Sequence, residues 1–151
     1  MRWKRVLMIG AIVVGVGGLG VAGASLLTYH EATKLDRSDP EVVTDEYLRA
    51  VLVRKDAVGA DLYACSDASR LAPVRALRDD LDRRERDFGV SIVVSWGAYE
   101  RTREQLVTTL TIVAIKDGVE QSGSEQRWRF TLVEEDGWRV CGAEKLPDSP
   151  S

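Results

Sequence analysis

The fold of this 151-residue chain is decided by the stretch Gln126-Arg-Trp-Arg-Phe-Thr-Leu-Val-Glu-Glu-Asp-Gly-Trp-Arg-Val-Cys141. Apolar and polar side chains alternate from Gln126 to Glu134, a period of two that predicts a half-buried β-strand. The apolar positions on one face of this strand are Trp128, Phe130 and Leu132. A tight turn follows at Glu135-Asp-Gly137, and residues 138–143 return as a second strand. The stretch therefore predicts a β-hairpin.

Two further strands precede this hairpin. Gln105–Lys116 alternates in the same way and ends at the turn dipeptide Asp117-Gly118. The side chains on one of its faces are Leu106, Thr108, Leu110, Ile112 and Ala114. Val90–Trp96 is rich in β-branched and apolar residues, which also favours a strand. We therefore expect about four antiparallel strands.

Helical patterns occupy the chain ahead of the strands. Asp39-Pro40 is typical of an N-cap followed by a proline in the first helical position, and predicts a helix from Pro40 to about Lys55. A short helix fits Ala57–Ala64. A third helical stretch opens at Ser66-Asp67, or later, since Pro73 is best tolerated in a first turn, and it ends at Gly89, the expected C-terminal stop. Its apolar stripe consists of Leu71, Val74, Leu77, Leu81 and Phe88.

The opposite face of the third helix carries a dense run of charge between Asp79 and Arg86. Acid-to-base pairs at i,i+4 spacing favour an exposed helix. The three pairs are Asp79/Arg83, Asp80/Arg84 and Asp82/Arg86. A docking strip for a partner and an ordinary solvated face both explain this run.

Helices followed by strands are the α+β pattern, in which helices pack on one face of a curved antiparallel sheet. We expect one such domain over residues 39–146, followed by a polar tail, 147–151, that is disordered. This part of the chain is long enough to bury a single core.

The N-terminal region has a different character. No charged residue occurs between Val6 and Leu27, a run of 22 residues. As a helix it would be about 33 Å long, enough to cross a hydrocarbon core of about 30 Å. The residues ahead of it hold three basic side chains and no acid, so we expect 1–5 to be a cytoplasmic tail. Residues 28–38 then link the transmembrane helix to an extracytoplasmic domain.

A cleaved secretory signal peptide is the alternative to a retained single-pass anchor. Ala22-Gly23-Ala24 offers a cleavage site, and a protein cut after Ala24 would be secreted. The apolar run is longer than the usual signal-peptide core of about 7–15 residues, which favours the anchor.

The two cysteines, Cys65 and Cys141, both lie in the outer part. Outside the membrane such a pair is expected to form a disulfide, with two buried thiols or a metal pair as alternatives. The only histidine, His30, lies at the membrane edge, so we expect no metal and no cofactor. The part after residue 30 has a net charge of about −6, which argues against a nucleic-acid surface.

Three segments carry a resemblance to a known family: Asp56–Cys65, the helix Arg75–Gly89, and the closing hairpin with a tryptophan after its turn glycine. Together they make residues 40–146 similar to the nuclear transport factor 2-like superfamily, a cone-shaped α+β fold. They resemble in particular its small membrane-anchored extracytoplasmic members from actinobacteria.

Two branches that this resemblance indicates share the layout of a short tail, one span and an outer domain. One is the inner-membrane assembly subunit of type IV secretion systems, and the other is the set of proteins associated with mammalian-cell-entry lipid transporters. Both imply a role in protein–protein assembly at the cytoplasmic membrane, within an envelope complex of the secretion or lipid-transport type. The chain shows no motif that selects either branch.

The same superfamily includes enzymes resembling ketosteroid isomerase, whose cone holds an acid–base pair. The expected inward faces of the strands here carry no carboxylate or histidine, so we expect no catalytic residues. A small apolar ligand in the cone is the alternative, and the candidate pocket residues are Tyr47, Trp96, Gln126, Trp128 and Phe130. The favoured reading is a membrane-tethered, non-enzymatic interaction domain of the cell envelope, with its oligomeric state open.

Overall fold

The computed structural model describes residues 36–148. The predicted tail 1–5 and span 6–27, and part of the predicted linker, lie outside this range, as do residues 149–151. Among residues 36–148, no helix is both long enough and apolar enough to cross a membrane.

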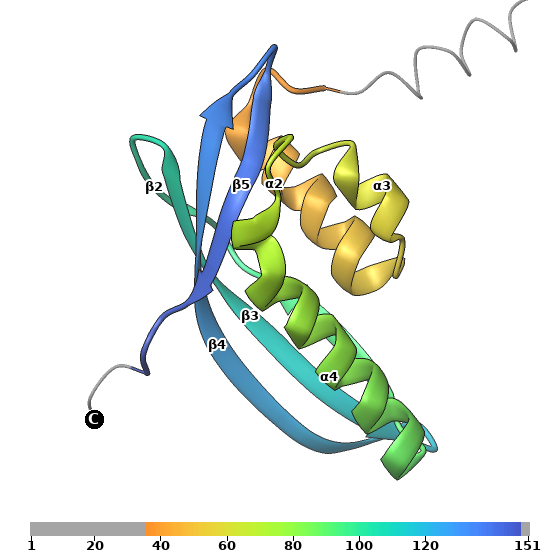
Figure 1. The fold of residues 1–151 in the computed structure, drawn as a ribbon. Helices are drawn as coiled ribbons and strands as arrows, with labels where there is room; N and C mark the ends of the chain where they lie inside the picture. Colours follow the sequence, from red (N-terminus) through yellow and green to blue (C-terminus); the bar gives the residue numbers. More distant parts are fainter. Residues whose placement is uncertain (1–35, 149–151) are drawn as a thin grey trace, which may run out of the picture. The chain divides into compact units, whose positions relative to one another are not determined.

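Helices precede strands along the domain, as Figure 1 shows. The helical part comprises α2 (Pro40–Leu48), the π-helical turn η1 (Arg49–Val53), α3 (Ala57–Asp61), the 3-10 turn η2 (Ser69–Leu71) and α4 (Ala72–Phe88). The strands are β1 (Ser91–Trp96), β2 (Glu100–Thr102), β3 (Gln105–Lys116), β4 (Val119–Glu134) and β5 (Trp138–Lys145). The helices pack on a curved antiparallel sheet, which confirms the α+β class.

The sheet has the order β1-β3-β4-β5, and every pairing is antiparallel. The short strand β2 also pairs with β3, beyond the end of β1, and adds a three-residue strand to the four that were expected. Leu110 of β3 lies between Trp96 of β1 and Gln126 of β4, so these three side chains share the face that the helices cover.

β4 is longer than the sequence pattern indicates. It begins at Val119 instead of Gln126, because the segment between them pairs with β3 even though both of its faces are exposed. Two irregularities interrupt the register of β4. One faces Ala114 and Ile115 of β3, and the other falls between Thr131 and Leu132 beside β5. Such bulges bend a strand and increase its twist.

The first predicted helix is present but ends two residues early. The Asp39 carboxylate accepts a hydrogen bond from the Glu41 N–H (2.8 Å), which confirms the N-cap. Beyond Leu48 the helix widens into η1, where the Arg54 N–H donates to the Arg49 carbonyl (2.8 Å), an i→i−5 bond. The prediction of a helix to Lys55 is wrong because Lys55 adopts a φ of 55°.

The second and third helices also differ from their predicted bounds, the second at its end and the third at its start. α3 stops at Asp61 rather than Ala64, because Ala64 forms a parallel bridge with Val140 of β5. α4 starts at Ala72 rather than near Ser66, with Pro73 in its first turn, where the missing proline N–H costs nothing. Gly89 has a φ of 60° and ends the helix in the left-handed conformation, as predicted.

The charged run on α4 pairs differently from the expected pattern. Of the three i,i+4 pairs, only Asp80–Arg84 forms, with its atoms 2.7 Å apart, and Arg83 approaches the same carboxylate. Asp82 pairs with Arg78, one turn earlier, and not with Arg86. The prediction failed for Asp82 because this residue lies at the border of the buried face, where Arg78 is almost fully buried.

The core lies between the helices and the covered face of the sheet. Its largest fully buried side chains include Tyr47, Leu48, Leu71, Leu81, Leu106, Leu110, Phe130 and Leu132. The disulfide between Cys65 and Cys141, whose Cα atoms are 5.0 Å apart, confirms the predicted pairing. It joins the segment after α3 to β5, across a sequence separation of 76 residues. The Glu135 carboxylate lies nearby, but sulfurs joined in a disulfide are not thiolate ligands for a metal.

Candidate interaction surface

Three of the five predicted pocket residues lie in the packed core. Tyr47 and Phe130 have no exposed surface, and Trp128 is 3% exposed. The Trp128 indole N–H donates to the side-chain oxygen of Gln126 (3.1 Å), so the fourth residue holds the indole from the same strand. Side chains therefore fill the curve of the sheet around Trp128 and Phe130.

The fifth residue, Trp96, lies half-buried at the end of β1. Its indole N–H donates to the Asp45 carboxylate (2.7 Å), whose other oxygen is 2.7 Å from the Arg49 guanidinium. Trp96 borders an open hollow of about 500 Å³ together with Val53 and other residues. The five predicted residues thus do not converge on a single cavity.

Two tyrosine hydroxyls are buried inside the domain, that of the fully buried Tyr47 and that of the partly buried Tyr99. Burial raises the pKa of Tyr47 to about 12, although the nearby Arg75 guanidinium opposes this shift. Burial also raises the pKa of Tyr99, and the Asp45 carboxylate adds to the effect. Neither hydroxyl has a hydrogen-bond partner among the described residues. Both pKa values move away from neutrality, which is the opposite of what a general acid or base requires.

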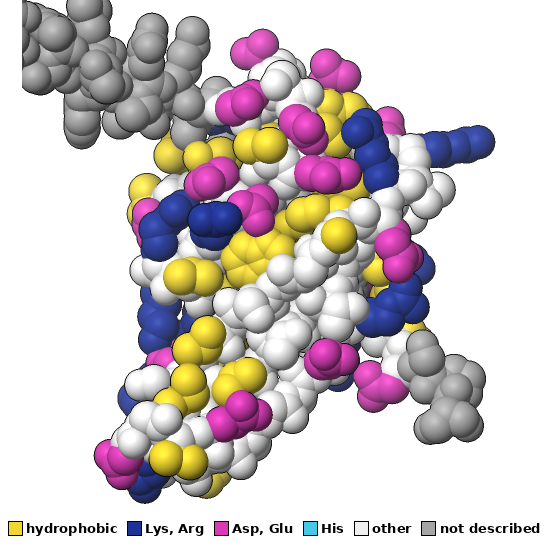
Figure 2. Space-filling model, turned by 180° about the vertical axis from the view of Figure 1, so that it is seen from behind, with side chains coloured by type: hydrophobic (Ala, Val, Ile, Leu, Met, Phe, Trp, Pro, Cys, Tyr) yellow, Lys and Arg dark blue, Asp and Glu magenta, His cyan; other side chains and the backbone are white. Residues whose placement is uncertain are grey.

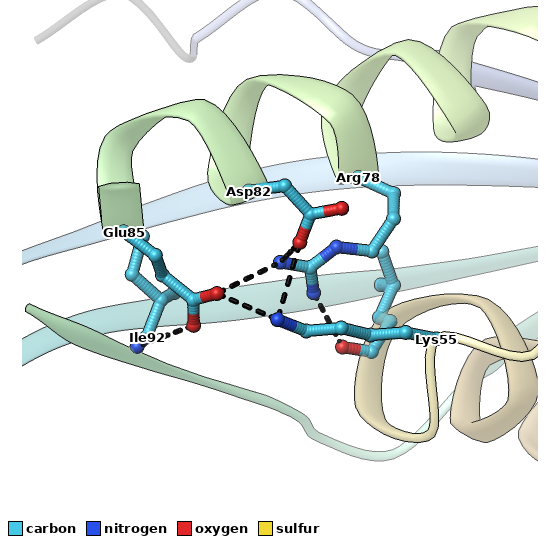
Figure 3. Close-up of polar contacts among 6 residues, drawn as sticks. Lys55, Arg78, Asp82, Glu85 and Ile92 are labelled. Carbon is cyan, nitrogen blue, oxygen red and sulfur yellow. Dashed lines mark hydrogen bonds and ion pairs between the residues drawn. The ribbon is translucent and has the colours of Figure 1, made fainter. Parts of the chain in front are cut away.

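A cluster of four charged side chains connects η1, α4 and β1; we call Lys55, Arg78, Asp82 and Glu85 the Arg78 cluster (Figure 3). Arg78 donates to the Leu52 carbonyl (2.7 Å) and lies 2.7 Å from the Asp82 carboxylate. Lys55 lies 2.6 Å from Glu85 and 3.2 Å from Asp82. The two cations and two anions neutralise one another.

Both acids of the Arg78 cluster are held in the charged form. Burial disfavours ionisation of Asp82, but hydrogen bonds from Lys55 and Arg78 outweigh burial and lower its pKa. The pKa of Glu85 is lowered in the same way against burial, by Lys55 and by the Ile92 N–H. The adjacent hollow of about 460 Å³ has three basic and three acidic side chains in its wall, so it offers no net charge to an ionic ligand. This cluster is a structural clamp.

The edges of the sheet are covered at two places. Along β5, the Cys65 N–H donates to the Val140 carbonyl (3.0 Å), and the Val140 N–H donates to the Tyr63 carbonyl (2.9 Å). Along β1, the Ile92 N–H donates to the Glu85 carboxylate (3.0 Å; Figure 3). Covering exposed N–H and C=O groups is how proteins prevent unwanted strand pairing.

The first half of β4 has no such cover. β5 pairs with β4 only from Trp128 to Glu134, and no other strand or bridge within residues 36–148 pairs with the outer edge of residues 119–126. Just beyond the end of β5, the Leu146 N–H donates to the Arg127 carbonyl (2.8 Å). Backbone N–H and C=O groups alternate in direction along an antiparallel strand. Since the Arg127 carbonyl points to the outer edge, the backbone groups of Glu125 and Gly123 point to the same edge. We call residues 119–126 the open edge.

The C-terminal segment does not close the open edge. Beyond Lys145 the chain turns away from β4 (Figure 1). A straight continuation of the β4–β5 register would set Asp148 opposite Glu125, and like charges directly opposite one another disfavour pairing. The open edge is therefore about 25 Å long, at roughly 3.3 Å per residue. Within residues 36–148, no strand or bridge pairs with the outward backbone groups of Gly123 and Glu125.

An amphipathic hollow of about 540 Å³ lies beside the open edge, between the end of α4 and the β3–β4 hairpin. Its apolar lining includes Phe88, Val90, Ile92, Ile112 and Ala114, and its polar lining includes Gln121, Ser122 and Ser124. Phe88 itself is 66% exposed. Figure 2 shows the domain from behind, and further hydrophobic side chains gather at the bottom of that view, the end of the domain that holds the end of α4 and the β3–β4 hairpin.

Sequence reasoning missed the open edge because residues 119–125 lack an alternating apolar pattern. The signal that could have found it is Asp117-Gly118. This turn was predicted, and because a two-residue hairpin turn joins residues that pair directly, the returning strand starts at Val119.

No protein-family model matches the chain, and no relative is found among curated proteins. Solved structures show a distant likeness. One, described as "Rd1NTF2_04 with long sheet", is 13% identical with a TM-score of 0.45, and the match covers 72% of this chain and all (100%) of that one. Another, "AclR a putative hydroxylase from Streptomyces galilaeus", is 15% identical with a TM-score of 0.45, over 76% of this chain and 91% of that one.

Proposed function

We propose that this chain is a membrane-tethered, non-enzymatic interaction domain of the cell envelope, which binds other proteins outside the cytoplasmic membrane. The observation that carries the proposal is the open edge of β4, which no strand or bridge pairs on its outer side within residues 36–148. An exposed row of backbone donors and acceptors is a ready template for an added strand.

Three further observations support the proposal. The core around Tyr47, Trp128 and Phe130 is packed, which leaves little room for a substrate at the predicted pocket residues. The Cys65–Cys141 disulfide suits an oxidising compartment. The uncharged run Val6–Leu27 supplies the proposed anchor, with residues 1–5 cytoplasmic. An assembly role of the secretion or lipid-transport type agrees with all three.

The anchor is tested by membrane fractionation and protease protection. We expect the full chain to resist alkaline extraction from membranes, and its C-terminal domain to be digested only from the extracytoplasmic side. A soluble product beginning after Ala24 would contradict the anchor and support signal cleavage.

The interaction role is tested by crosslinking in intact cells, followed by pull-down of the full chain from solubilised membranes. We expect at least one envelope protein, including further copies of this chain, to be captured above background. The matched control is Glu125→Pro, which removes an outward-facing N–H without touching the β3 ladder. Capture of nothing, or equal capture by wild type and control, would overturn the proposal.

A second candidate function is binding of a small amphipathic ligand in the hollow between α4 and the β3–β4 hairpin. Its volume of about 540 Å³ favours this candidate, since ligand pockets span about 300–1,000 Å³. The test is fluorescence of 8-anilinonaphthalene-1-sulfonate with the full chain. Ala114→Phe should abolish saturable binding, while Val93→Phe, on the outer face of β1, should not. Unsaturable binding, or binding unaffected by Ala114→Phe, would exclude this candidate.

A further inference from the structure

We infer that the hollow between the end of α4 and the β3–β4 hairpin binds an anionic, single-chain amphiphile, with its tail on the apolar floor and its headgroup near Arg84 and Lys116. This inference rests on the second candidate function and names the chemical class of its ligand. It requires an apolar surface for the tail, an excess of positive charge for the headgroup, and a volume that suits one chain.

The floor of the hollow is the covered face of the sheet, and its character changes from strand to strand. Ile92 of β1 lies opposite Ala114 of β3, which in turn lies opposite Ser122 of β4. In the next row, Ile112 of β3 lies opposite Ser124 of β4. The floor is therefore apolar over β1 and β3 and carries hydroxyl groups over β4.

Much of the apolar lining is still open to water. Phe88, the last residue of α4, is 66% exposed, and Ile92 and Ala114 are only partly buried. Removal of apolar surface from water is the main driving force for binding a hydrocarbon tail. The hollow thus offers an apolar surface that a tail would cover.

The charged side chains in the wall of the hollow are Arg84 and Lys116, and no carboxylate group of residues 36–148 lines it. Lys116 ends β3 and forms no ion pair with any residue of this range. Arg84 pairs with Asp80 (2.7 Å), but the same carboxylate also holds Arg83. One acid therefore serves two bases, and the hollow keeps an excess of positive charge.

The acids of this part of β4 belong to the other face of the sheet. Glu120 pairs with Ile115 and Glu125 pairs with Thr111, and both partners alternate with the residues of the floor. The Glu120 carboxylate lies beside Gly123 on that outer face. An anionic headgroup in the hollow would therefore meet the two cations and the hydroxyl groups of β4, which can donate hydrogen bonds to it.

The volume of the hollow, about 540 Å³, lies in the lower half of the range of about 300–1,000 Å³ that ligand pockets span. It therefore suits one hydrocarbon chain rather than the paired chains of a membrane phospholipid. The hollow beside the Arg78 cluster is of similar size but has balanced charge in its wall, so the preference for an anion is a property of this hollow and not of that one.

The first test uses the full chain in nanodiscs of phosphatidylcholine, photolabelled with a dodecanoate that carries a diazirine at the end of its chain. We expect saturable labelling of the floor residues, located by mass spectrometry, and its loss in Ala114→Phe. Lys116→Gln and Arg84→Gln should each raise the half-saturating concentration about threefold, since an exposed ion pair contributes modestly. Lys116→Arg keeps the charge and should leave this concentration unchanged.

The matched control is Arg86→Gln, which removes the same charge from α4 at a residue outside the hollow. This variant should be labelled as wild type is. Labelling that is weakened equally in Arg86→Gln, or that is unaffected by both Lys116→Gln and Arg84→Gln, would overturn the inference.

The second test varies the headgroup on the same diazirine chain. For each compound, the ratio of labelling between wild type and the double variant R84Q/K116Q cancels the partitioning of that compound into the disc. This ratio should be about tenfold for the carboxylate, near one for the neutral alcohol and below one for the trimethylammonium compound. An equal ratio for all three headgroups would overturn the anionic ligand.

The same labelling distinguishes a free amphiphile from a membrane lipid. A phosphatidylglycerol with the diazirine on one of its two chains should label the hollow less than the carboxylate does. Stronger labelling by phosphatidylglycerol would overturn the single-chain ligand.

The outcomes separate this inference from the second candidate function. Saturable labelling that Ala114→Phe abolishes, without dependence on either cation, would overturn the anionic ligand and leave a binder of neutral amphiphiles. Absence of saturable labelling by all three compounds would overturn both. Neither result changes the interaction role proposed for the open edge, which crosslinking and pull-down test separately.

Discussion

The Arg78 guanidinium donates to the backbone carbonyl of Leu52 at 2.7 Å, across 26 residues of sequence. This bond fixes α4 against the turn η1, and the same guanidinium also holds Asp82. An arginine that is almost fully buried is stable only while its partners remain in place.

Arg78→Ala should destabilise the domain by about 2–3 kcal/mol. This loss is smaller than the one expected when a fully buried ion pair is broken, because Asp82 and Glu85 are partly exposed to water. The substitution leaves the Leu52 carbonyl without its donor and both acids with Lys55 as their only cation in the cluster. Urea unfolding measures the loss. Arg84→Ala is the control, since its pair with Asp80 is on the exposed face and should contribute about 0.5 kcal/mol or less. Equal losses in the two variants would contradict the clamp role.

Acid should weaken the Arg78 cluster. The pKa values of Asp82 and Glu85 are lower in the folded protein than in the unfolded chain, so their contribution to stability is complete above the unfolded values of about 3.9 and 4.3. It is lost as the pH falls through the folded pKa values. Urea unfolding between about pH 7 and about pH 3 should show a smaller acid loss in Lys55→Met than in wild type. An identical acid loss would mean that Lys55 does not lower these pKa values.

Removal of the Cys65–Cys141 disulfide should lower the free energy of unfolding by about 4–5 kcal/mol, because the bond closes a long loop in the unfolded chain. The double variant C65S/C141S should show this loss, and wild type with a reductant should match it. Electrophoresis after alkylation without reductant should detect no free thiol. Two readily alkylated cysteines would contradict the pairing.

Tyr47→Phe should stabilise the domain by about 1 kcal/mol, since the hydroxyl is buried without a hydrogen-bond partner and phenylalanine keeps the ring. Absorbance titration should show the loss of one phenol that ionises near pH 12. Tyr63→Phe is the comparison, because its hydroxyl is not among the buried unpaired atoms. A destabilised Tyr47→Phe would indicate that Arg75 or a water molecule satisfies this hydroxyl.

Local patterns were sufficient for most of the fold. The Asp39 cap, the Gly89 stop, the alternation of Gln105–Lys116 and the cysteine pair are each determined by neighbouring residues or by one simple expectation, and each prediction was confirmed. Helix ends were less predictable. Ala64 leaves α3 because β5 offers it a partner, and no short-range signal reports a bridge to Val140.

The candidate surface was hidden for a different reason. Hydrophobic alternation detects strands that have one buried face, whereas residues 119–125 are exposed on both faces and are held only by backbone bonds to β3. Their side chains therefore show no apolar alternation that would indicate this pairing. The predicted pocket residues Trp128 and Phe130 stand out in the sequence because they are large and aromatic. Both are buried in the core, so large aromatic residues are poor indicators of a cavity here.

The segment that enters the domain is fastened to the turn between β4 and β5. The Trp138 N–H donates to the Arg37 carbonyl (2.8 Å), and the Arg37 side chain reaches the Leu62 carbonyl. A pulling force on the chain ahead of residue 36 would therefore reach β5 and the segment before the disulfide before it could unwind α2. Tension at the point where the proposed tether begins would thus load hydrogen bonds to the two segments that the covalent Cys65–Cys141 link joins.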